Sequence, residues 1–518
     1  HFEPFMEAAL NRIPSLKHAG IRQFFNGPES FTADSKHILG IAPGYNNLFI
    51  AAGFNTTGIM TSAGAGMCIA QWIVNGYPSM DMWEVDPRRF ERWQSTDAYI
   101  GARTYESPGL AFAMHWPHRQ PKTARNVKKS TLHNSLAKCG ACFGVVAGWE
   151  KPLWYTPQDR TPKIKYSFGQ QHWWPYSAAE VKALTNNVVI FDQSQMTIFE
   201  LEGPDVTNFL QRICANNVSR KIGQVIYSQM LNNRGGIECD VTVTRLQQDK
   251  YRIVTGATNK VRDHDWIDSQ IKYEKLSIED VSSSYGILML MGPKSRSLLS
   301  SLVPASLENS DFPFGTMIQT EIGYAMLEIQ RLSYVGELGF ELYVPMEAIQ
   351  HVYDTLITHG ESYHLQHAGI LSMDSCRIEK GYRHWGHELT PSVTPLEAGL
   401  EFAVDFTKNF TGREALTSQK TSGLTRHLMM FQISTGEPLL LHDEPIYANG
   451  DLVGETTSGT KSFRVGGHLA FGFIRHPNGE TRSQLLKRQY QIQIGNQTYP
   501  AKILARAPYD HKGERMRL

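Results

Sequence analysis

The sequence has little that would place it in a membrane, on nucleic acid or in an oxidising compartment. No uninterrupted apolar run reaches the about 18 residues that a membrane-spanning helix needs. The 51 lysines and arginines balance 50 aspartates and glutamates, so no basic excess indicates nucleic acid. Six cysteines are scattered over 518 residues, which is not the pattern of a disulfide framework. We expect no membrane span, no nucleic-acid partner and a reducing compartment.

The chain also lacks internal repeats, low-complexity segments and a recognisable signal or transit peptide. A length of 518 residues with 41% hydrophobic residues is typical of a globular protein, and it is too long for one core. We therefore expect three or four domains or domain pieces. The first residues, HFEPFMEAALNRIPSL from His1, have the character of the middle of a domain, so we expect a fragment whose targeting information has gone.

The most informative stretch is RLSYVGELGFELY, residues 331–343. It predicts two short strands around a turn at residues 336–339, after which Glu341 and Tyr343 share one strand face. A carboxylate that accepts paired N–H donors, next to an aromatic surface, suits a flat, nitrogen-rich ring. The alternative is an ordinary hairpin with a polar outer face.

A second acid lies in the middle of a predicted strand. In LNNRGGIECDVTVTRL, a turn at residues 234–236 precedes a strand with Ile237, Cys239, Val241 and Val243 facing inward. Asp240 faces the other way, although aspartate is disfavoured in strands. Either that face is solvated or the acid is required in a pocket, and nothing in the local pattern decides.

Near the N-terminus, a strand, a glycine-rich turn and a helix follow one another. Residues 47–53 form an apolar run, glycines follow at 53, 58, 64 and 66, and residues 67–76 predict a helix with Ile69, Trp72 and Ile73 on one face. This order is typical of a nucleotide-binding corner. It is not the GxGxxG fingerprint, so close helix–strand packing remains an equal alternative.

Other segments indicate architecture rather than chemistry. Residues 206–213 and 346–360 predict amphipathic helices, and the last hundred residues predict a small β-barrel with a hairpin turn at Asn449-Gly450. Cys139 and Cys142 form a lone CxxC pair, and the histidines at 384 and 387 have no acidic partner. We assign no metal site.

Several motifs together resemble a known family. The segments NGPESFTADSKHILG and AAGFNTTGIMTSAGAG resemble the last part of the flavin domain of sarcosine and dimethylglycine dehydrogenases. From about residue 178, LNNRGGIECDVTV, LMGPKSRSLL, LSYVGELGFELY, SMDSCRIEKGYRHWG, TPLEAGLEF and FTGREAL resemble in order the glycine-cleavage T-protein (aminomethyltransferase) module. The family's N-terminal GxGxxG and flavin-linked histidine have no counterpart here.

The resemblance implies an α+β multidomain fold. It implies the C-terminal part of an FAD-dependent oxidoreductase domain at 1–95, a central linker domain at 96–172, a folate-binding domain at 173–415 and a β-barrel domain at 416–518. By motif match, the implied FAD neighbours are Gly53, Phe54, Asn55, Gly58, Ile59, Met60 and Thr61. The implied tetrahydrofolate neighbours are Asp240, Val241, Thr242, Tyr334, Glu341, Leu342, Tyr343, Arg377 and Phe402, which stands where dimethylglycine dehydrogenases have tyrosine.

The implied reaction has two steps. Flavin accepts a hydride from the N-methyl group of a methylated glycine, and tetrahydrofolate captures the one-carbon unit in a pocket that excludes water. Asp240 is the candidate catalytic acid or base, with Glu341 and Tyr343 orienting the pterin. The implied partners are a small methylated amino acid and an electron acceptor such as an electron-transfer flavoprotein. The location would be the mitochondrial matrix in a eukaryote or the cytoplasm in a bacterium.

Two alternative functions remain open. The regulatory subunit of pyruvate dehydrogenase phosphatase has the same architecture, but its segment similar to GELGFELY lacks the glutamate that Glu341 supplies here. A stand-alone, aminomethyltransferase-like folate binder is the other. Among the dehydrogenases, LNNRGG and RHWGHELTPSVTPLEAGL are somewhat closer to the sarcosine enzymes, although dimethylglycine remains possible.

Overall fold

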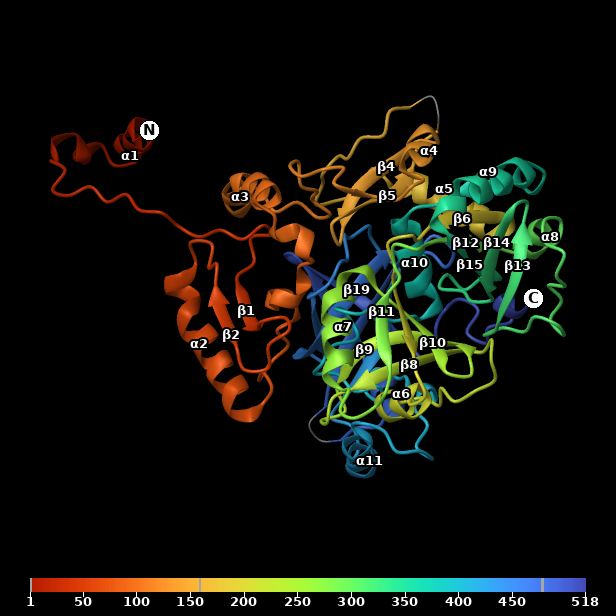
Figure 1. Ribbon diagram of the computed structural model, residues 1–518. Helices are drawn as coiled ribbons and strands as arrows, with labels where there is room; N and C mark the ends of the chain where they lie inside the picture. The colour runs from red at the N-terminus through yellow and green to blue at the C-terminus, as the bar shows by residue number, and fades with distance from the viewer. Residues whose placement is uncertain (1, 158–159, 477–478) are drawn as a thin grey trace.

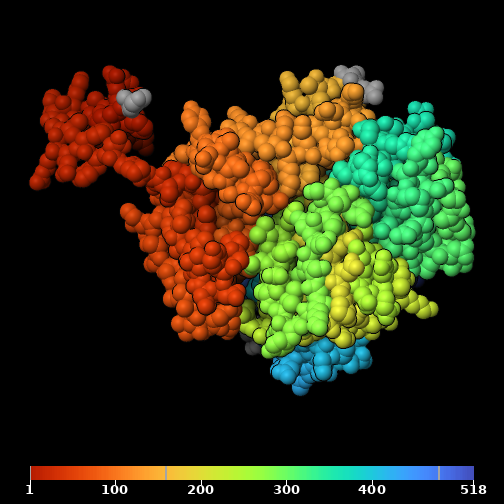
Figure 2. All heavy atoms as spheres, in the orientation of Figure 1, coloured from red at the N-terminus to blue at the C-terminus, as the bar shows by residue number. Residues whose placement is uncertain are grey.

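The protein consists of an N-terminal lobe and a larger body, in which two sheets and a barrel pack together (Figure 1). The computed structural model describes residues 2–157, 160–476 and 479–518, so His1 lies outside the described residues. The first helix stands clear of the body on an extended arm, as Figure 2 shows from outside. No described helix has both the length and the apolar character needed to cross a bilayer.

The N-terminal lobe is small and has little core. Its elements are α1 (Glu3–Arg12), β1 (Ile38–Ile41), β2 (Phe49–Ala52), α2 (Gly58–Asn75) and α3 (Asp97–Phe112). β2 pairs only with β1, so the predicted buried strand is half exposed. α2 begins at Gly58 and not near residue 67, and Ile73 is exposed, which corrects two expectations. Gly76 ends the helix with φ 78°, as predicted.

A small central sheet connects this lobe to the body. It contains β3 (Lys128–Lys129), β5 (Trp149–Tyr155) and β4 (Ala141–Val146), with α4 (His133–Lys138) before β4. Trp154 of β5 is buried with Trp173 and Trp174 in one aromatic cluster. These tryptophans therefore have the structural role that such side chains usually have in a core.

The body contains a six-stranded sheet and a five-stranded sheet. In spatial order, the first sheet has β13 (Met317–Ile322), β14 (Ala325–Gln330), β15 (Gly339–Pro345), β12 (Tyr285–Met291), β6 (Val188–Asp192) and β16 (Leu365–His367). The second has β11 (Ser277–Asp280), β7 (Thr197–Glu202), β10 (Lys250–Thr255), β9 (Ile237–Gln247) and β8 (Val225–Leu231). Helices pack against both sheets (Figure 1).

Several helices pack in the body, and two of them, α6 and α9, are the amphipathic helices that the sequence predicts. In chain order, the helices are α5 (Trp174–Asn186), α6 (Val206–Ile213), α7 (Lys260–Ser269), α8 (Ser295–Ser300), α9 (Ile349–Gly360), α10 (Ile370–Lys380) and α11 (Arg413–Ser422). The apolar stripe of α6 is fully buried. The stripe of α9 is residues 349, 352, 353, 356 and 357, of which the first four are buried and Ile357 is partly buried. A hydrophobic spacing of three and four residues was therefore sufficient to predict both helix faces.

The predicted hairpin at residues 331–343 is correct only in its second half. β15 begins at Gly339, but residues 331–338 form a loop, and the antiparallel partners of β15 are β14 and β12. Gly336 has φ 79°, and Glu337 is bound by Arg464 and Arg515 from distant parts of the chain. These contacts hold the segment as a loop.

The turn between β8 and β9 is closely packed against a neighbouring loop. A Cβ atom on Gly236 would lie 1.9 Å from the Pro391 carbonyl oxygen, which is too close for any side chain. We expect Gly236→Ala to lower the free energy of unfolding by about 1–3 kcal/mol, because backbone must move to admit the methyl group. Urea unfolding measures this loss. The control must be a glycine whose backbone tolerates alanine, which rules out Gly450 with its φ of 92°. Gly64→Ala, with open space around its Cβ position inside α2, should have no such cost.

The C-terminal residues form the predicted barrel, which confirms the fold class. Its closed order is β17 (Arg426–Ile433), β20 (His468–Arg475), β19 (Asp451–Lys461), β18 (Pro445–Ala448), β21 (Tyr490–Ile494) and β22 (Gln497–Leu504). Asn449 and Gly450 make the two-residue turn between β18 and β19, both with positive φ. The short α12 (Arg482–Leu485) lies between β20 and β21.

Candidate functional site

The candidate site is the polar seam where the two large sheets of the body face each other. Arg252 of β10 binds Glu200 of β7 at 2.7 Å and also Glu328 of β14, so it joins the sheets at one place. Gln330 donates to Thr244 Oγ1 of β9 at 3.2 Å and joins them at another. We use the name polar seam for this facing surface of β8, β9 and β10 against β14 and β15.

Glu341 and Tyr343 lie on the face of β15 that contributes to the seam. Tyr343 is fully buried and donates to Glu341 Oε2 at 3.1 Å. Burial raises the pKa of Glu341 to about 7, and the hydrogen bond from Tyr343 only partly opposes this. Two polar side chains enclosed in this way are not a solvated outer face, so the ordinary-hairpin alternative does not describe them.

Asp240 lies on the face of β9 that is turned toward the seam. It is half-buried and accepts a hydrogen bond from Gln229 Nε2 at 3.0 Å. Burial raises the pKa of Asp240 to about 6, while Gln229 and Tyr227 oppose the rise. A carboxyl group with this pKa can exchange a proton near neutral pH, which a general base requires.

Strand periodicity separates the other predicted folate neighbours. Thr242 is half-buried on the Asp240 face, but Val241 is in the core behind β9 and Leu342 is in the core behind β15. The side chains of Val241 and Leu342 therefore point away from the seam. Tyr334 is half-buried in the loop before β15, and its hydroxyl donates to the Arg383 carbonyl at 2.8 Å.

Phe402 and Arg377 differ in their freedom to contact a ligand. Phe402 is 75% exposed and lies near-parallel to Tyr227, with ring centroids 6.3 Å apart, so it offers an open aromatic surface. Arg377 is buried and binds Asp374 at 2.7 Å, Glu388 at 3.0 Å and Ser458 at 2.8 Å. These contacts anchor α10 to the barrel.

The predicted FAD neighbours form one compact corner of the N-terminal lobe. The side chain of Asn55 is buried, donates to the Gly53 carbonyl at 2.7 Å and accepts from Thr32 N–H at 2.8 Å. Gly53 has φ 64°, and a Cβ atom there would lie 2.5 Å from Thr32. The positive φ and the close packing against Thr32 explain why residue 53 is a glycine.

The remaining members of the corner lie at the start of α2. Gly58 is its first residue, Thr61 binds the Thr57 carbonyl at 2.9 Å, and Phe54 stacks on His37 at 5.4 Å. Ile59 and Met60 are exposed, so they present an apolar surface beside the helix N-terminus. The backbone turn, helix N-terminus and apolar side chains fit a flavin ring and its chain, which are the groups that the resemblance implies.

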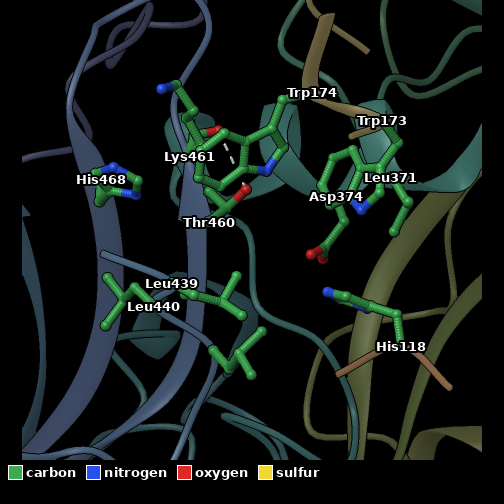
Figure 3. A pocket seen from close by; sticks show the side chains of 12 residues that line it. His118, Trp173, Trp174, Leu371, Asp374, Leu439, Leu440, Thr460, Lys461 and His468 are labelled. Atoms are coloured by element: carbon green, nitrogen blue, oxygen red, sulfur yellow. Dashed lines mark hydrogen bonds between the residues drawn. The ribbon is translucent and has the colours of Figure 1, made fainter. Parts of the chain in front are cut away.

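A small pocket elsewhere in the body contains none of the predicted site residues. It has a volume of about 30 Å³ and lies where the central segment, α10 and the barrel meet. Figure 3 shows the Asp374 carboxylate and the His118 ring directed toward each other, with Trp173 beside them. A space of this volume holds one or two water molecules and not a pterin.

Sequence reasoning missed the residues that support the two acids. Gln229 lies directly opposite Asp240 in the β8–β9 pair, and Tyr227 lies opposite Thr242. A β-bulge between Met230 and Leu231 shifts the register, so counting outward from the turn at residues 232–236 would place Ser228, and not Gln229, opposite Asp240. Gln330 lies opposite Glu341, but its contact with Thr244 joins two sheets, and no local pattern predicts such a contact.

The unpaired acceptors of the polar seam fit the hydrogen-bonding groups of a folate. Gln229 Oε1 and Gln330 Oε1 are buried acceptors with no hydrogen-bond partner among the described residues. A reduced pterin is rich in N–H donors, and unpaired acceptors beside two carboxyl groups are what such a ring can satisfy.

Family comparisons match most of the chain. Residues 75–130 match the model of the FAD dependent oxidoreductase central domain, and residues 132–408 match the GCVT N-terminal domain. Residues 426–510 match the glycine cleavage T-protein C-terminal barrel domain. The GCVT match alone covers more than half of the chain.

Curated relatives resemble the chain over nearly its whole length. It is 36% identical to 4-methylaminobutanoate oxidase (formaldehyde-forming) of Paenarthrobacter nicotinovorans, over 100% of this chain and 62% of that protein. It is 33% identical to mitochondrial sarcosine dehydrogenase of Mus musculus, over 100% of this chain and 61% of that protein. It is 32% identical to the mitochondrial pyruvate dehydrogenase phosphatase regulatory subunit of Mus musculus, over 97% of this chain and 60% of that protein. The chain thus spans about three fifths of these relatives.

Solved structures support the fold. Aminomethyltransferase T of the glycine cleavage system from Bartonella henselae matches 74% of this chain and 99% of that protein, with a TM-score of 0.63. Its sequence identity is 24%, so the likeness concerns the arrangement of the sheets and the barrel.

Proposed function

The chain belongs to the glycine-cleavage T-protein (GCVT) family, with the domain order of the sarcosine and dimethylglycine dehydrogenases, and from this we propose that it is part of an FAD-dependent demethylase. The enzyme oxidises the N-methyl group of a small methylated amino acid and transfers the one-carbon unit to tetrahydrofolate. The observation that carries the folate half is the enclosed Glu341–Tyr343 pair facing the polar seam.

In the polar seam, each acid has its own task. Glu341, oriented by Tyr343, accepts N–H groups of the pterin ring. Asp240, held by Gln229, accepts the proton that a folate nitrogen loses when it attacks the one-carbon unit. Exclusion of water from the seam limits hydrolysis of that unit to formaldehyde. Phe402 provides an aromatic surface at the edge of the site.

The N-terminal lobe would hold the flavin, which supplies hydride acceptance when bound. The Gly53–Asn55 turn lets backbone approach the ring, and the first turn of α2 offers N–H groups. Exposed apolar side chains on α2 give this lobe a face that fits packing against further parts of a flavin-binding domain: Ile59, Met60, Met67, Ile73 and Val74.

The substrate remains within one chemical class. We propose sarcosine as the preferred substrate and dimethylglycine as a possible one, on the motif likeness and the relative named sarcosine dehydrogenase. The relative named 4-methylaminobutanoate oxidase supports a longer methylated amino acid as the second candidate. The name of that relative gives formaldehyde as its product, so folate capture must be tested separately from oxidation.

The partner and location follow the same reasoning. We propose an electron acceptor such as an electron-transfer flavoprotein, since reduced flavin must be reoxidised. The relatives named as mitochondrial support the matrix as the location if the source is a eukaryote. A bacterial source would place the protein in the cytoplasm.

Titration of tetrahydrofolate into this chain tests the folate half directly. A folate-binding site predicts saturable binding with one molecule per chain, and Glu341→Gln should weaken it by at least about tenfold, because a charge-assisted hydrogen-bond pair is lost. Glu347→Gln, an exposed acid at the start of the next helix, serves as the matched control. Absence of saturable binding would favour the non-catalytic scaffold, which the likeness to the phosphatase regulatory subunit keeps as the alternative.

Binding of tetrahydrofolate should depend on pH through Glu341. Its pKa is raised to about 7 by burial, so the carboxylate that accepts pterin N–H groups is formed as pH rises through 7. Below that value a proton must leave before the ring binds, and Kd should rise about tenfold for each pH unit. In Glu341→Gln, Asp240 is the remaining carboxyl group of the pair, and the pH below which Kd begins to rise should move to about 6. A wild-type profile that is flat from pH 5.5 to 8 would contradict this assignment.

A further inference from the structure

Two buried glutamines, one on each of the facing sheets, carry an amide oxygen without a partner. Gln229 on β8 and Gln330 on β14 are both fully buried. The Oε1 atom of each accepts no hydrogen bond from any part of the chain that the structure describes. Buried acceptors are normally paired, because leaving one unpaired is unfavourable. Two of them on the two facing sheets need a physical explanation.

The direction of the Gln229 oxygen follows from chemistry. Gln229 Nε2 lies 3.0 Å from Asp240 Oδ1, and an ionised carboxylate can only accept. The amide NH₂ must therefore face Asp240, and the oxygen must point away from it. Since Gln229 and Asp240 are directly opposite in the β8–β9 pair, their side chains project from the same face, which is turned toward the seam.

Gln330 lies opposite the second acid in its sheet. Gln330 is directly opposite Glu341 in the β14–β15 pair, and its Nε2 is anchored to Thr244 Oγ1 at 3.2 Å. Thr244 is four residues from Asp240 on β9, which is about 13 Å along a strand. The two glutamines thus lie at different levels of the seam, Gln229 opposite Asp240 and Gln330 opposite Glu341.

Resting on the proposed function above, we propose that Gln229 and Gln330 select the reduction state of the folate. A tetrahydropterin carries N–H groups at N5 and N8, whereas fully oxidised pterin has lone pairs at both atoms. Two amide oxygens can accept hydrogen bonds from the reduced ring but oppose the lone pairs of the oxidised ring. A site built to pair with N–H groups rejects analogues that lack them, because its own buried groups are then left unpaired.

The test compares three ligands that differ in these N–H groups. The Kd of the chain is measured by calorimetry for tetrahydrofolate, for dihydrofolate, which keeps N8–H and lacks N5–H, and for folic acid, which lacks both. We expect Kd to increase in that order, by about tenfold for each missing N–H, since an unpaired buried acceptor has a penalty of that size. This series uses the unaltered chain, so it does not depend on whether a variant folds.

Two substitutions test whether Gln229 and Gln330 cause the preference for tetrahydrofolate over folic acid. Gln229→Met and Gln330→Met keep side-chain length and remove the amide, so each should weaken tetrahydrofolate binding far more than folic acid binding. The ratio of the two Kd values should then fall about tenfold in each variant. Gln432→Met, on barrel strand β17, is the matched control and should leave the ratio unchanged.

Each outcome has a separate meaning. Equal Kd values for the three ligands, or an unchanged ratio in both folded variants, would overturn this inference and leave folate binding intact. Failure of all three ligands to bind would overturn the proposed function together with the inference.

Discussion

Replacing Asp240 by asparagine in the full-length protein should abolish transfer of the one-carbon unit to tetrahydrofolate while amine oxidation continues. Asparagine keeps the shape of the side chain and can still accept from Gln229, but it cannot take up a proton. General-base assistance typically contributes 10²–10⁴-fold, so the yield of methylenetetrahydrofolate per amine oxidised should fall by about that factor. Formaldehyde should appear in its place, because the uncaptured unit is hydrolysed.

The comparison needs both products measured in the same reaction. Asp268→Asn, an exposed aspartate on α7, is the matched control and should leave both yields unchanged. An Asp240→Asn enzyme that still forms methylenetetrahydrofolate at the wild-type rate would remove Asp240 from the chemistry. Loss of amine oxidation as well would indicate that the substitution disturbs more than the folate half.

Replacing Arg464 by methionine should have the largest effect on stability. Arg464 lies between the barrel strands β19 and β20 and binds Glu379 of α10, and it also donates to Glu337 at 3.2 Å. Its guanidinium stacks on Tyr509 at 3.6 Å. Both glutamates are fully buried, so the substitution leaves their charges under-compensated. Removing one partner of such a network typically costs about 3–5 kcal/mol.

The expected result is a large drop in the urea midpoint of the transition that includes the barrel. Arg475→Met is the matched control, because Arg475 pairs with Glu455 at 3.2 Å in an exposed ion pair on the same barrel. Exposed pairs contribute about 0–1 kcal/mol, so this variant should remain close to wild type. If Arg464→Met and Arg475→Met lost the same small amount of stability, the buried network would not be what holds the barrel to α10 and to the loop at residues 331–338.

The Arg464 network also explains why the sequence misplaced a strand. Alternation correctly placed Glu341 and Tyr343 on one face of β15, because side-chain direction in a strand is a local property. Residues 331–335 have the same β-favouring composition, yet they form a loop. Glu337 is bound by Arg464, Arg515 and Tyr509, all distant in the sequence. Contacts of this kind override local propensity and leave no local signal.

The same distinction applies to the site. Asp240 could be identified as an acid in the middle of a strand, and it is half-buried and bonded to Gln229. Gln229 could not be found by counting from the hairpin turn, because a β-bulge between Met230 and Leu231 shifts the register by one residue. The Gln330–Thr244 contact required knowledge of how two sheets face each other. In the N-terminal lobe, Ile73 was expected inside because it lies on an apolar helix face. It is exposed because a two-stranded sheet is too small to cover that face.

The most direct test of the account is a crystal structure of this chain with tetrahydrofolate. The account predicts pterin electron density in the polar seam, with ring N–H groups within hydrogen-bond distance of Glu341 and a ring nitrogen near Asp240. Density for the ring outside the seam, or tetrahydrofolate bound with Glu341 and Asp240 both untouched, would contradict it.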